Sequence, residues 1–553
     1  MKFPARMYRS IPLFLAALVT WGAADLAAQT ACEPGQAEAL LDVNDVRARI
    51  FNNGNLFRRE DPHVYEVPKG MGTSALFTAG LWLGGQAGGA IRASGTNYHT
   101  YEFAPGPLGA DGSPLPDCEA FDRIYQIDAA DLRQFEETGQ LTEDLRDWPH
   151  DLGAPVIDGD GIAANYNLGG GDRPAILGHR MLWWIMNDGA AVRRFEENPP
   201  LPVEVRASAF ALASDAAALD QATFYRYRIR YRGTQPLDSA YVGLFVDPDL
   251  GHFGDDYVGA DTTLNLGFAY NADDADDRDQ GGYGAAPPAV GIALLQGPRA
   301  TPDGRDNDRD GTVDEAGERH GMTTFVTSHL EVHEMARPGH IYRSLRGVRP
   351  NGPGPIRAGM YGSGDGAVTT IMFPGDPVTR QYWSEVKPAP EATQPLAPGD
   401  RMMLVGAGPF TMQPGEEQEV VFAIVWARGA DHLDSVTRLR AASRAVHAAF
   451  DAGLDTAVTT QDAEAPGAFA LFTNGPNPFH ASTEIRFALP APSMVRLEVF
   501  DVLGRRVAVL VDRRLPAGRH AARFDATGLG SGVYLYRIEA GAFRETRTML
   551  LLK

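Results

Sequence analysis

The strongest constraint on the fold of this chain comes from residues 223–231, where two kinds of side chain alternate. Three tyrosines and Ile229 occupy every second position, and three arginines lie between them. A period of two places alternate side chains on opposite faces of a β-strand. The segment therefore predicts a strand with one buried and one solvated face, which requires a β-sheet around it.

Other segments extend this prediction to a β-rich body. Residues 420–426 are apolar throughout, as in a central strand that is covered on both faces. Residues 435–452 are the best helix candidate, with a cap at Asp434 or Ser435 and an end at Gly453. The 61 glycines and 39 prolines favour short strands and long loops. We predict a mainly β protein: a large β-sandwich-like body with long loops and one C-terminal helix.

The length of 553 residues exceeds one hydrophobic core, because single cores stop growing at roughly 250–300 residues. The chain has 71 acidic and 50 basic side chains, for a formal net charge of -21. Residues 466–553 carry twelve basic and seven acidic side chains, a net charge of +5, so the remainder carries -26. An acidic chain lacks the basic surface that binds phosphates, which argues against a nucleic-acid-binding protein. The uneven charge predicts two parts with different functions.

The first 28 residues have the layout of a secretory signal peptide. Lys2, Arg6 and Arg9 precede an apolar run at residues 11–21, and small residues follow up to Ala28. The run is shorter than the about 20 apolar residues that span a bilayer. We predict export, cleavage after Ala28 and a mature protein without a transmembrane segment.

The chain contains two cysteines, Cys32 and Cys118. In an exported protein both are open to oxidation, so a disulfide between them would tie the mature N-terminus to the body. Sequence spacing does not supply the geometry of the bond, and two unpaired thiols remain the alternative.

The sharpest motif in the body is an acidic loop with the spacing Asp-x-Asp-x-Asp-Gly at residues 306–311. Alternate oxygens of such a loop surround one cation, and the glycine permits a sharp turn. Gly317 stands where an EF-hand has its bidentate glutamate, so Glu315 or Glu318 would have to replace that ligand. We predict a structural calcium site, with a solvated acidic loop as the alternative. The candidate ligands are Asp306, Asp308, Asp310, the carbonyl of Thr312, Asp314 and Glu315.

A second acidic region lies between residues 247 and 279. Its carboxylates repel one another unless a cation or solvent screens them. A second calcium site and a solvated loop are equal alternatives here. The candidate ligands are Asp247, Asp249, Asp255, Asp256 and Asp261.

Common catalytic motifs are missing from the sequence, so no catalytic residue is assigned. There is no Gly-x-Ser-x-Gly elbow and no Walker-A loop, and His333-Glu334 lacks the second histidine of a zinc-protease motif. A glycoside hydrolase needs only two carboxylates placed in space, and Trp183-Trp184 could offer an indole to a sugar or lie buried between layers. Two hypotheses follow for the body: a calcium-stabilised structural, adhesive or ligand-binding module, and a secreted hydrolase of polysaccharide or protein.

The C-terminal residues form a pattern of short apolar-alternating segments after a linker-like stretch at 454–475. Pro490, Gly504, Gly518 and Gly530 are among the residues that separate these segments. The pattern predicts a small immunoglobulin-like β-sandwich.

Several blocks of this C-terminal part, in their order and spacing, resemble the type A sorting domain of type IX secretion. The blocks are Asn477-Pro478-Phe479, 485–487, 499–505, 529–534 and the terminal Lys553. The resemblance covers residues 476–553. It assigns sorting roles to Asn477, Pro478, Phe479, Asp501, Leu503, Gly504, Gly532, Val533, Tyr534 and Lys553. We expect Gly504 and Gly532 in turns, and Leu503, Val533 and Tyr534 in the core.

The resemblance implies a route and a set of partners. The signal peptide directs passage into the periplasm, and the type IX secretion machinery then carries the folded protein across the outer membrane. The sorting domain is commonly removed, and the body is released or attached to surface lipopolysaccharide, so the protein is secreted or lies on the outer cell surface. The expected organisation is a signal peptide at 1–28, a β-rich extracellular body of one or two subdomains at 29–453, a linker at 454–475 and the sorting domain at 476–553. The body resembles the large bodies of other proteins with such a tail, and no activity is attached to that resemblance.

Overall fold

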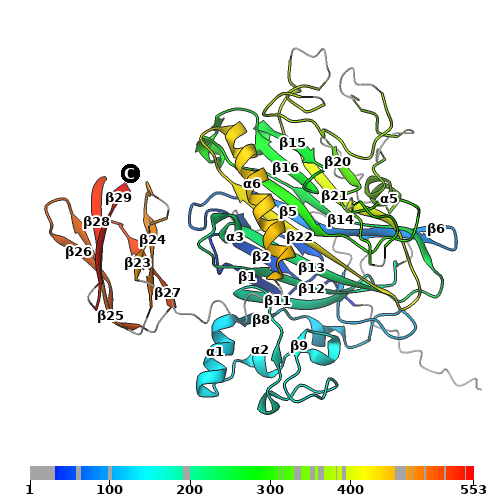
Figure 1. Cartoon of the computed structure of the whole chain (residues 1–553), viewed down its shortest axis with the longest axis horizontal. Coiled ribbons are helices and arrows are strands. Elements are labelled where there is room, and N and C mark those ends of the chain that lie inside the picture. The colour runs from blue at the N-terminus through cyan, green and yellow to red at the C-terminus, as the bar shows by residue number, and fades with distance from the viewer. Residues whose placement is uncertain are drawn as a thin grey trace, which may run out of the picture.

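The computed structural model describes residues 32–552 apart from short gaps, and it shows a two-sheet body followed by a separate C-terminal β-module (Figure 1). Outside the described residues lie 1–31, 58–63, 97–102, 191–199, 309–310, 316, 329–337, 349–354, 359–365, 382, 389–393, 455–468, 473, 476, 491–492, 516–517, 542 and 553. The predicted signal peptide, most of the predicted linker, Asp310 and Lys553 therefore fall outside the described part of the chain.

The first sheet of the body has nine strands within the described residues, in the order β1-β2-β3-β5-β14-β21-β20, with β4 beside β2 and β6 beside β5. Its strands are β1 (Glu38–Leu41), β2 (Arg47–Phe51), β3 (Asn55–Leu56), β4 (Tyr65–Glu66), β5 (Thr78–Ala87), β6 (Ala90–Gly95), β14 (Leu237–Asp247), β20 (Thr324–Ser328) and β21 (Met402–Met412). The sheet is antiparallel, and it joins segments from both ends of the body.

The second sheet also has nine described strands, in the order β15-β16-β19-β22-β13-β12-β11-β7, with β8 beside β11. Its strands are β7 (Ala104–Pro105), β8 (Tyr125–Asp128), β11 (Arg180–Asn187), β12 (Val203–Ala211), β13 (Ala222–Tyr231), β15 (Asp256–Asp261), β16 (Leu266–Asn271), β19 (Ala289–Gln296) and β22 (Glu417–Ala427). The apolar segment at 420–426 is thus the middle of a central strand, as predicted.

The main hydrophobic core lies between the two sheets. Tyr225, Tyr227, Ile229 and Tyr231 of β13 are buried there against residues of the first sheet such as Leu244. On the other face of β13, Arg228 and Arg230 are opposite Glu419 and Glu417 of β22, and Arg228 Nε lies 3.0 Å from Glu419. The alternation of the sequence therefore separates a dry face from a face covered by ion pairs.

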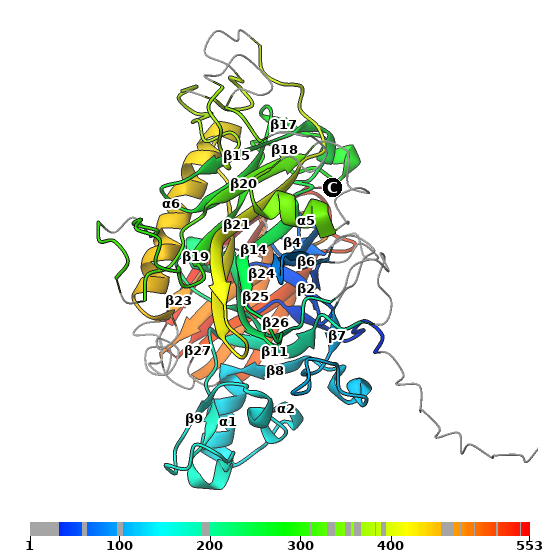
Figure 2. The same cartoon turned by 90° about the vertical axis from the view of Figure 1, so that its right-hand side faces the viewer.

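The outer face of the second sheet is covered by the helix α6 (His432–Asp451), as Figures 1 and 2 show. Val436, Leu439 and Val446 of α6 are buried in a second core with side chains such as Phe268. The helix begins three residues earlier than predicted, because Asp431 caps it: its side chain accepts a hydrogen bond of 2.7 Å from Asp434 N.

An excursion of about fifty residues leaves the second sheet at β8 and returns at β11, two strands that pair with each other. It holds helices that the sequence analysis did not predict, and it protrudes from the lower end of the body in Figure 1. Within the described residues, the remaining α-helices are α1 (Ala129–Thr138), α2 (Glu143–Arg146), α3 (Ala217–Asp220) and α5 (Pro338–Leu345). The remaining strand pairs of the body are β9 (Val156–Ile157) with β10 (Arg173–Pro174), and β17 (Ala275–Asp276) with β18 (Gly284–Ala285). Short 3-10 helices lie at Cys118–Phe121, His150–Leu152, Leu168–Gly170, Phe253–Asp255 and Arg278–Gln280.

The C-terminal module consists of two small antiparallel sheets that enclose a core of their own. Its strands are β23 (Ala470–Leu471), β24 (Ser482–Leu489), β25 (Ser493–Asp501), β26 (Arg506–Leu515), β27 (Gly518–Asp525), β28 (Gly532–Ala540) and β29 (Phe543–Leu551). One sheet has the order β23-β24-β27 and the other β26-β25-β28-β29. The mainly β fold with few helices is confirmed, whereas the immunoglobulin-like type of the C-terminal module stays a prediction.

Candidate cation sites and the C-terminal module

The acidic loop that begins at Asp306 folds so that three carboxylates meet. Ligand oxygens of Asp306, Asp308 and Glu318 all lie within 4.8 Å of one another. Glu318 is buried and accepts a short hydrogen bond from Asn307 N, and Asp306 accepts one of 3.0 Å from Gly311 N. Glu318, which the sequence analysis weighed only as a substitute, is the third member of this group.

Asp314 and Glu315, two of the other predicted ligands of this loop, are not in that group. Asp314 accepts hydrogen bonds from Asp303 N at 2.8 Å and Gly304 N at 2.9 Å. Its carboxylate therefore links the end of the loop to its beginning. The carbonyl of Thr312 stays a predicted ligand, because the group consists of side-chain carboxylates only, and Asp310 lies outside the described residues.

The second acidic region contributes two of its predicted residues to another group. Asp247 and Asp249 lie with Asp400, and their ligand oxygens are within 4.8 Å of one another. Asp247 ends β14, and Asp400 comes two residues before β21. These strands pair antiparallel, with Val246 opposite Met403. The end of β14 and the start of β21 therefore lie side by side. Asp400 was missed because only this pairing, across some 150 residues, brings it to Asp247.

The remaining predicted ligands of that region have other surroundings. Asp261 forms an ion pair of 3.2 Å with Arg440 of α6. Asp256 is buried: its Oδ2 accepts a hydrogen bond of 3.1 Å from Leu250 N, and its Oδ1 has no hydrogen-bond partner among the described residues. Burial raises the pKa of Asp256 well above its usual range, and the nearby carboxylates of Asp255 and Asp249 raise it further.

A third group lies in the excursion between β8 and β11 and was not predicted. Asp158, Asp160 and Asp172 have ligand oxygens within 4.8 Å of one another. Asp172 is buried and accepts hydrogen bonds from Gly159 N at 2.9 Å and Asn167 N at 2.7 Å. Its sequence signal is the Asp-Gly-Asp-Gly run that starts at Asp158, which is shorter than the Asp-x-Asp-x-Asp-Gly motif of a calcium loop.

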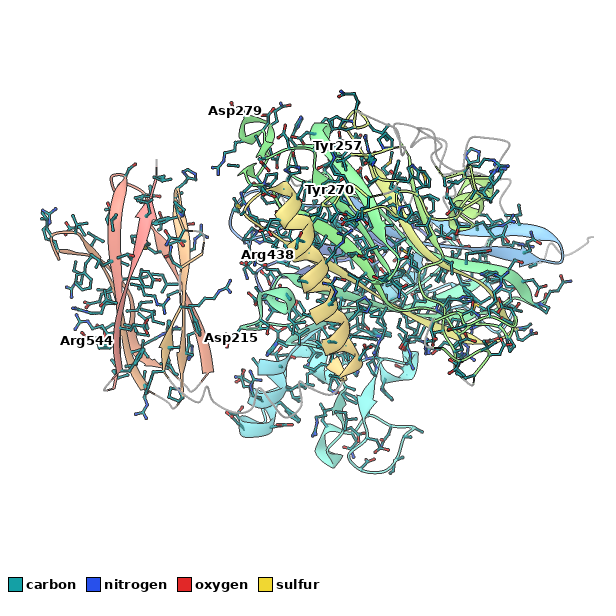
Figure 3. The ribbon with its side chains drawn as sticks, turned by 45° about the horizontal axis from the view of Figure 1, so that its top comes forward. Asp215, Tyr257, Tyr270, Asp279, Arg438 and Arg544 are labelled. Atoms are coloured by element: carbon teal, nitrogen blue, oxygen red, sulfur yellow. A yellow bond between two sulfur atoms is a disulfide. The ribbon has the colours of Figure 1, made fainter. Side chains whose placement is uncertain are left out.

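Two adjacent tryptophans bear on the hydrolase hypothesis. Trp183 and Trp184 of β11 are both buried, one in the core beneath α6 and the other in the core between the sheets. Neither indole is available to stack on a sugar, which agrees with the alternative weighed from the sequence. Tyr257 and Tyr270, opposite each other on β15 and β16 (Figure 3), are likewise buried, with ring centroids 5.8 Å apart.

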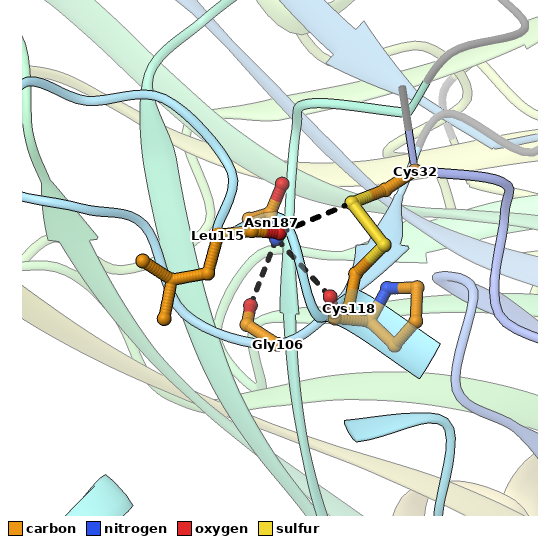
Figure 4. Close-up of a disulfide and its surroundings, with 6 residues drawn as sticks. Cys32, Gly106, Leu115, Cys118 and Asn187 are labelled. Atoms are coloured by element: carbon orange, nitrogen blue, oxygen red, sulfur yellow. Dashed lines mark hydrogen bonds between the residues drawn. A yellow bond between two sulfur atoms is a disulfide. The ribbon is translucent and has the colours of Figure 1, made fainter. Parts of the chain in front are cut away.

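The N-terminal end of the described chain is fixed to the body by a disulfide between Cys32 and Cys118, whose Cα atoms are 6.0 Å apart (Figure 4). Cys32 Sγ also lies 3.4 Å from the carbonyl oxygen of Leu115. Beside the bond, the buried Asn187 donates a hydrogen bond of 2.9 Å to the carbonyl of Gly106. The disulfide therefore lies where the first described residues meet the edge of the second sheet.

In the C-terminal module, the residues of the first sequence block join the end of the chain. Phe479 is buried, its N–H donates to the carbonyl of Leu550 at 2.9 Å, and its carbonyl accepts from Leu552 N at 2.8 Å. Asn477 Oδ1 accepts a hydrogen bond of 2.9 Å from Leu550 N. This block therefore adds a short parallel pairing beside the end of β29.

The predicted turn at Gly504 is present, with φ of 73° between β25 and β26. Asp501 holds it: its Oδ1 accepts hydrogen bonds from Leu503 N at 3.0 Å and Arg505 N at 2.9 Å. These bonds to backbone N–H groups lower the pKa of Asp501.

The expected core positions are only partly correct. Tyr534 is buried, and its hydroxyl donates to the carbonyl of Gly530 at 2.8 Å. Leu503 and Val533 are exposed instead: Leu503 lies in the turn beyond the last core residue of β25, and Val533 is the strand neighbour of Tyr534 and faces the opposite way. Gly532 is the first residue of β28, not a turn residue.

Comparison with known proteins identifies the C-terminal module and assigns no function to the body. Residues 476–551 match the model of the secretion system C-terminal sorting domain. A polysaccharide lyase structure is 7% identical, with a match over 72% of this chain and 39% of that chain and a TM-score of 0.17. The dimeric latent form of PorU from Porphyromonas gingivalis is 9% identical, over 67% of this chain and 31% of that chain, with a TM-score of 0.13. Similarity at this level says nothing about activity, and no curated protein sequence matches the chain.

The C-terminal match is the finding that bears on location. Among the described residues, no helix is long and apolar enough to cross a membrane. The match at residues 476–551 confirms the resemblance to the type IX sorting domain. The chain is therefore a protein that the type IX route delivers to the cell surface or the extracellular space.

Proposed function

We propose that the body is a calcium-stabilised structural, adhesive or ligand-binding module, and that the C-terminal module is its export signal. The C-terminal match supports the export signal. The observation that supports calcium is the convergence of Asp306, Asp308 and Glu318 to within 4.8 Å in a loop with a glycine at its turn.

The spacing of these carboxylates suits a calcium ion. Calcium binds oxygen ligands at about 2.3–2.6 Å, so two ligands on opposite sides of one ion are about 4.6–5.2 Å apart. Without a cation, three carboxylates this close repel one another. The groups around Asp247 and Asp158 meet the same distance criterion, so calcium would tie loops at three separate places of the body.

The proposed route begins with the signal peptide at residues 1–28. The type IX machinery then recognises the sorting domain, and removal of that domain within 454–475 leaves the body free or attached to surface lipopolysaccharide. A deletion of residues 476–553 tests the export role in the native host. We expect the truncated protein to accumulate in the periplasm, and an unchanged extracellular yield would contradict the proposal.

Calcium binding is tested by thermal unfolding of the purified body with calcium and with a chelator. We expect calcium to raise the melting temperature, since a ligand at about 100 times its dissociation constant adds about 2.7 kcal/mol of stability. Substituting Asp306→Asn and Asp308→Asn together should reduce this shift. Asp279→Asn is the matched control, because Asp279 is exposed in the 3-10 helix Arg278–Gln280 (Figure 3) and belongs to none of the carboxylate groups. A melting temperature that does not respond to chelator would rule out structural calcium.

A further inference from the structure

The connection between the two sheets at residues 247–256 contains a buried carboxylate oxygen that no hydrogen bond explains. β14 of the first sheet ends at Asp247, and β15 of the second sheet begins at Asp256. Asp256 is 1% exposed; its Oδ2 accepts a hydrogen bond from Leu250 N, whereas its Oδ1 has no hydrogen-bond partner among the described residues. Tyr257, which follows Asp256, is labelled in Figure 3. Buried polar atoms almost always have a partner, so this oxygen points to a bound water or ion.

This oxygen lies beside one of the carboxylate groups. We call that group the crossover group; it consists of Asp247, Asp249 and Asp400. Leu250, which donates to Asp256 Oδ2, directly follows Asp249 in the chain. Gly399 N donates a hydrogen bond of 3.2 Å to the carbonyl of Asp256, and Asp400 is the next residue. Asp256 is therefore held between the two segments that supply the crossover group, although it is not itself one of the three.

The cationic side chain next to the crossover group in the sequence does not neutralise it. Arg401 Nε lies 2.9 Å from Glu385, and the other two guanidinium nitrogens donate to the carbonyls of Asp400 and Ala397. Asp400 Oδ1, like Asp256 Oδ1, has no hydrogen-bond partner among the described residues. Carboxylates this close repel one another in a partly buried place, so a cation from solution would stabilise the arrangement.

The backbone that carries the crossover group is fixed by bonds of its own. Phe77 N donates to the carbonyl of Asp247 at 2.9 Å, and Gly251 N donates to the carbonyl of Ser74 at 3.0 Å. Gly251 has a φ of 77°, and a Cβ there would meet the carboxylate of Asp276. The connection is thus held in one shape on both sides of Asp249, and rigid oxygen sites bind calcium more tightly.

We propose that the crossover group binds a calcium ion, and that a water molecule on this ion donates a hydrogen bond to Asp256 Oδ1. One ion would then tie the connection between the two sheets to the start of β21. The inference rests on the proposed calcium-stabilised body and identifies its tightest site. That site should bind more tightly than the loop at Asp306, because Asp247 and Asp256 are buried whereas Asp308 is exposed.

The ligand set favours calcium over other metals. The crossover group offers carboxylate oxygens only, whereas zinc and copper prefer nitrogen or sulfur ligands. Calcium takes about six to eight oxygen ligands, so three carboxylates leave room for a bound water. Side chains that hold such ligands from outside the coordination shell contribute to affinity, which gives Asp256 a positioning role.

The test is calcium binding by the metal-depleted full chain, measured by equilibrium dialysis against calcium buffers. Asp247→Asn with Asp400→Asn should remove one bound ion. Asp256→Asn should keep the number of ions and raise the lowest dissociation constant by about 10–100-fold, because the water loses its acceptor. Asp273→Asn is the matched control: it removes an exposed carboxylate from the same acidic region that belongs to none of the groups, and it should leave every dissociation constant unchanged.

An unchanged calcium affinity of Asp256→Asn would overturn the proposal, and so would an unchanged number of ions in the Asp247→Asn, Asp400→Asn variant. If Asp256→Asn does not keep the circular dichroism spectrum of the unchanged protein, a crystal structure of the unchanged protein grown with calcium decides. We expect an ion on the crossover group and a water about 2.7–3.0 Å from Asp256 Oδ1. The lack of this ion, or an ion without that water, would overturn the proposal.

The failure of this inference can be told apart from the failure of the calcium-stabilised body. Loss of all bound calcium in the Asp306→Asn, Asp308→Asn variant would show that only the loop site binds. That result would overturn the inference and leave the calcium-stabilised body standing. If the unchanged protein binds no calcium at all, both fail together.

Discussion

At the scale of single residues, Asp276 shows how burial competes with hydrogen bonding. Its carboxylate accepts hydrogen bonds from Tyr283 N and His252 N, which favour the charged form. Burial outweighs them and raises its pKa to about 6 from the ordinary 3.8. Because the folded state holds this proton more tightly, the stability that the group contributes is complete below about pH 4 and is lost as the pH rises through about 6.

Asp276→Asn should therefore change the pH dependence of stability. The asparagine does not titrate, so the stability of the unchanged protein relative to the variant should fall by about 1–2 kcal/mol between pH 4 and pH 7, after allowance for solvent screening. Denaturant unfolding at both pH values measures this difference. A difference that is the same at pH 4 and pH 7 would contradict the assignment.

A second residue-scale prediction concerns the buried ion pair between Arg401 and Glu385, at 2.9 Å. Burial raises the pKa of Glu385 to about 7 even beside Arg401. Arg401→Met should therefore destabilise the body most above pH 7, by up to about 3–5 kcal/mol, because there it leaves the carboxylate of Glu385 buried without its cation. Arg146→Met is the control, since the pair of Arg146 with Asp147 is exposed. Thermal unfolding should show a lower melting temperature for Arg401→Met and an unchanged one for Arg146→Met. Similar melting temperatures for the two variants would contradict the prediction.

At the scale of elements, the sequence predicts those strands and helices whose apolar residues recur at a regular local spacing. The alternation at 223–231 gave β13, the apolar run gave the centre of β22, and the apolar stripe gave α6. The helix start was placed late because Asp431, Asp434 and Ser435 are all chemically suited to cap, and only the extended backbone of Asp431 selects it. The helices between β8 and β11 were missed because they are short and carry little apolar surface of their own.

The capping role of Asp431 gives a prediction for α6. Asp431→Ala should cost about 1 kcal/mol, because Asp434 N loses its acceptor at the start of the helix. Asp451→Ala, at the last residue of the same helix, should be neutral or slightly stabilising, since a negative charge there opposes the helix dipole. Unfolding midpoints compare the two, and an equal effect at both ends would contradict the capping role.

At the scale of the whole molecule, the candidate sites depend on contacts that no local pattern contains. Asp306 and Asp308 could be predicted because they share one loop, whereas Asp400 reaches Asp247 only through the pairing of β14 with β21. The exposure of Leu503 and Val533 has the same origin. Their apolar character suggested core positions, but where the strands end and which way each residue faces determine which side chains are buried.

The uneven charge gives a prediction at this scale. Cleavage between residues 454 and 475 removes a basic module, so the released body should be more acidic than the uncleaved chain. It should bind an anion exchanger more tightly and elute at higher salt, and mass spectrometry of the eluted protein would locate the cut. Elution at equal or lower salt, with the cut at that place, would contradict the division of charge.

The bond between Cys32 and Cys118 has a mechanical consequence for a protein displayed on a surface. Tension applied at the N-terminus passes through the sulfur atoms directly to residue 118 and bypasses the 85 residues between the two cysteines. Those residues contain β1 to β7, including every strand of the first sheet that precedes β14. A pull along the chain would therefore leave these six of the nine described strands of the sheet unloaded, and they could not be peeled away one by one.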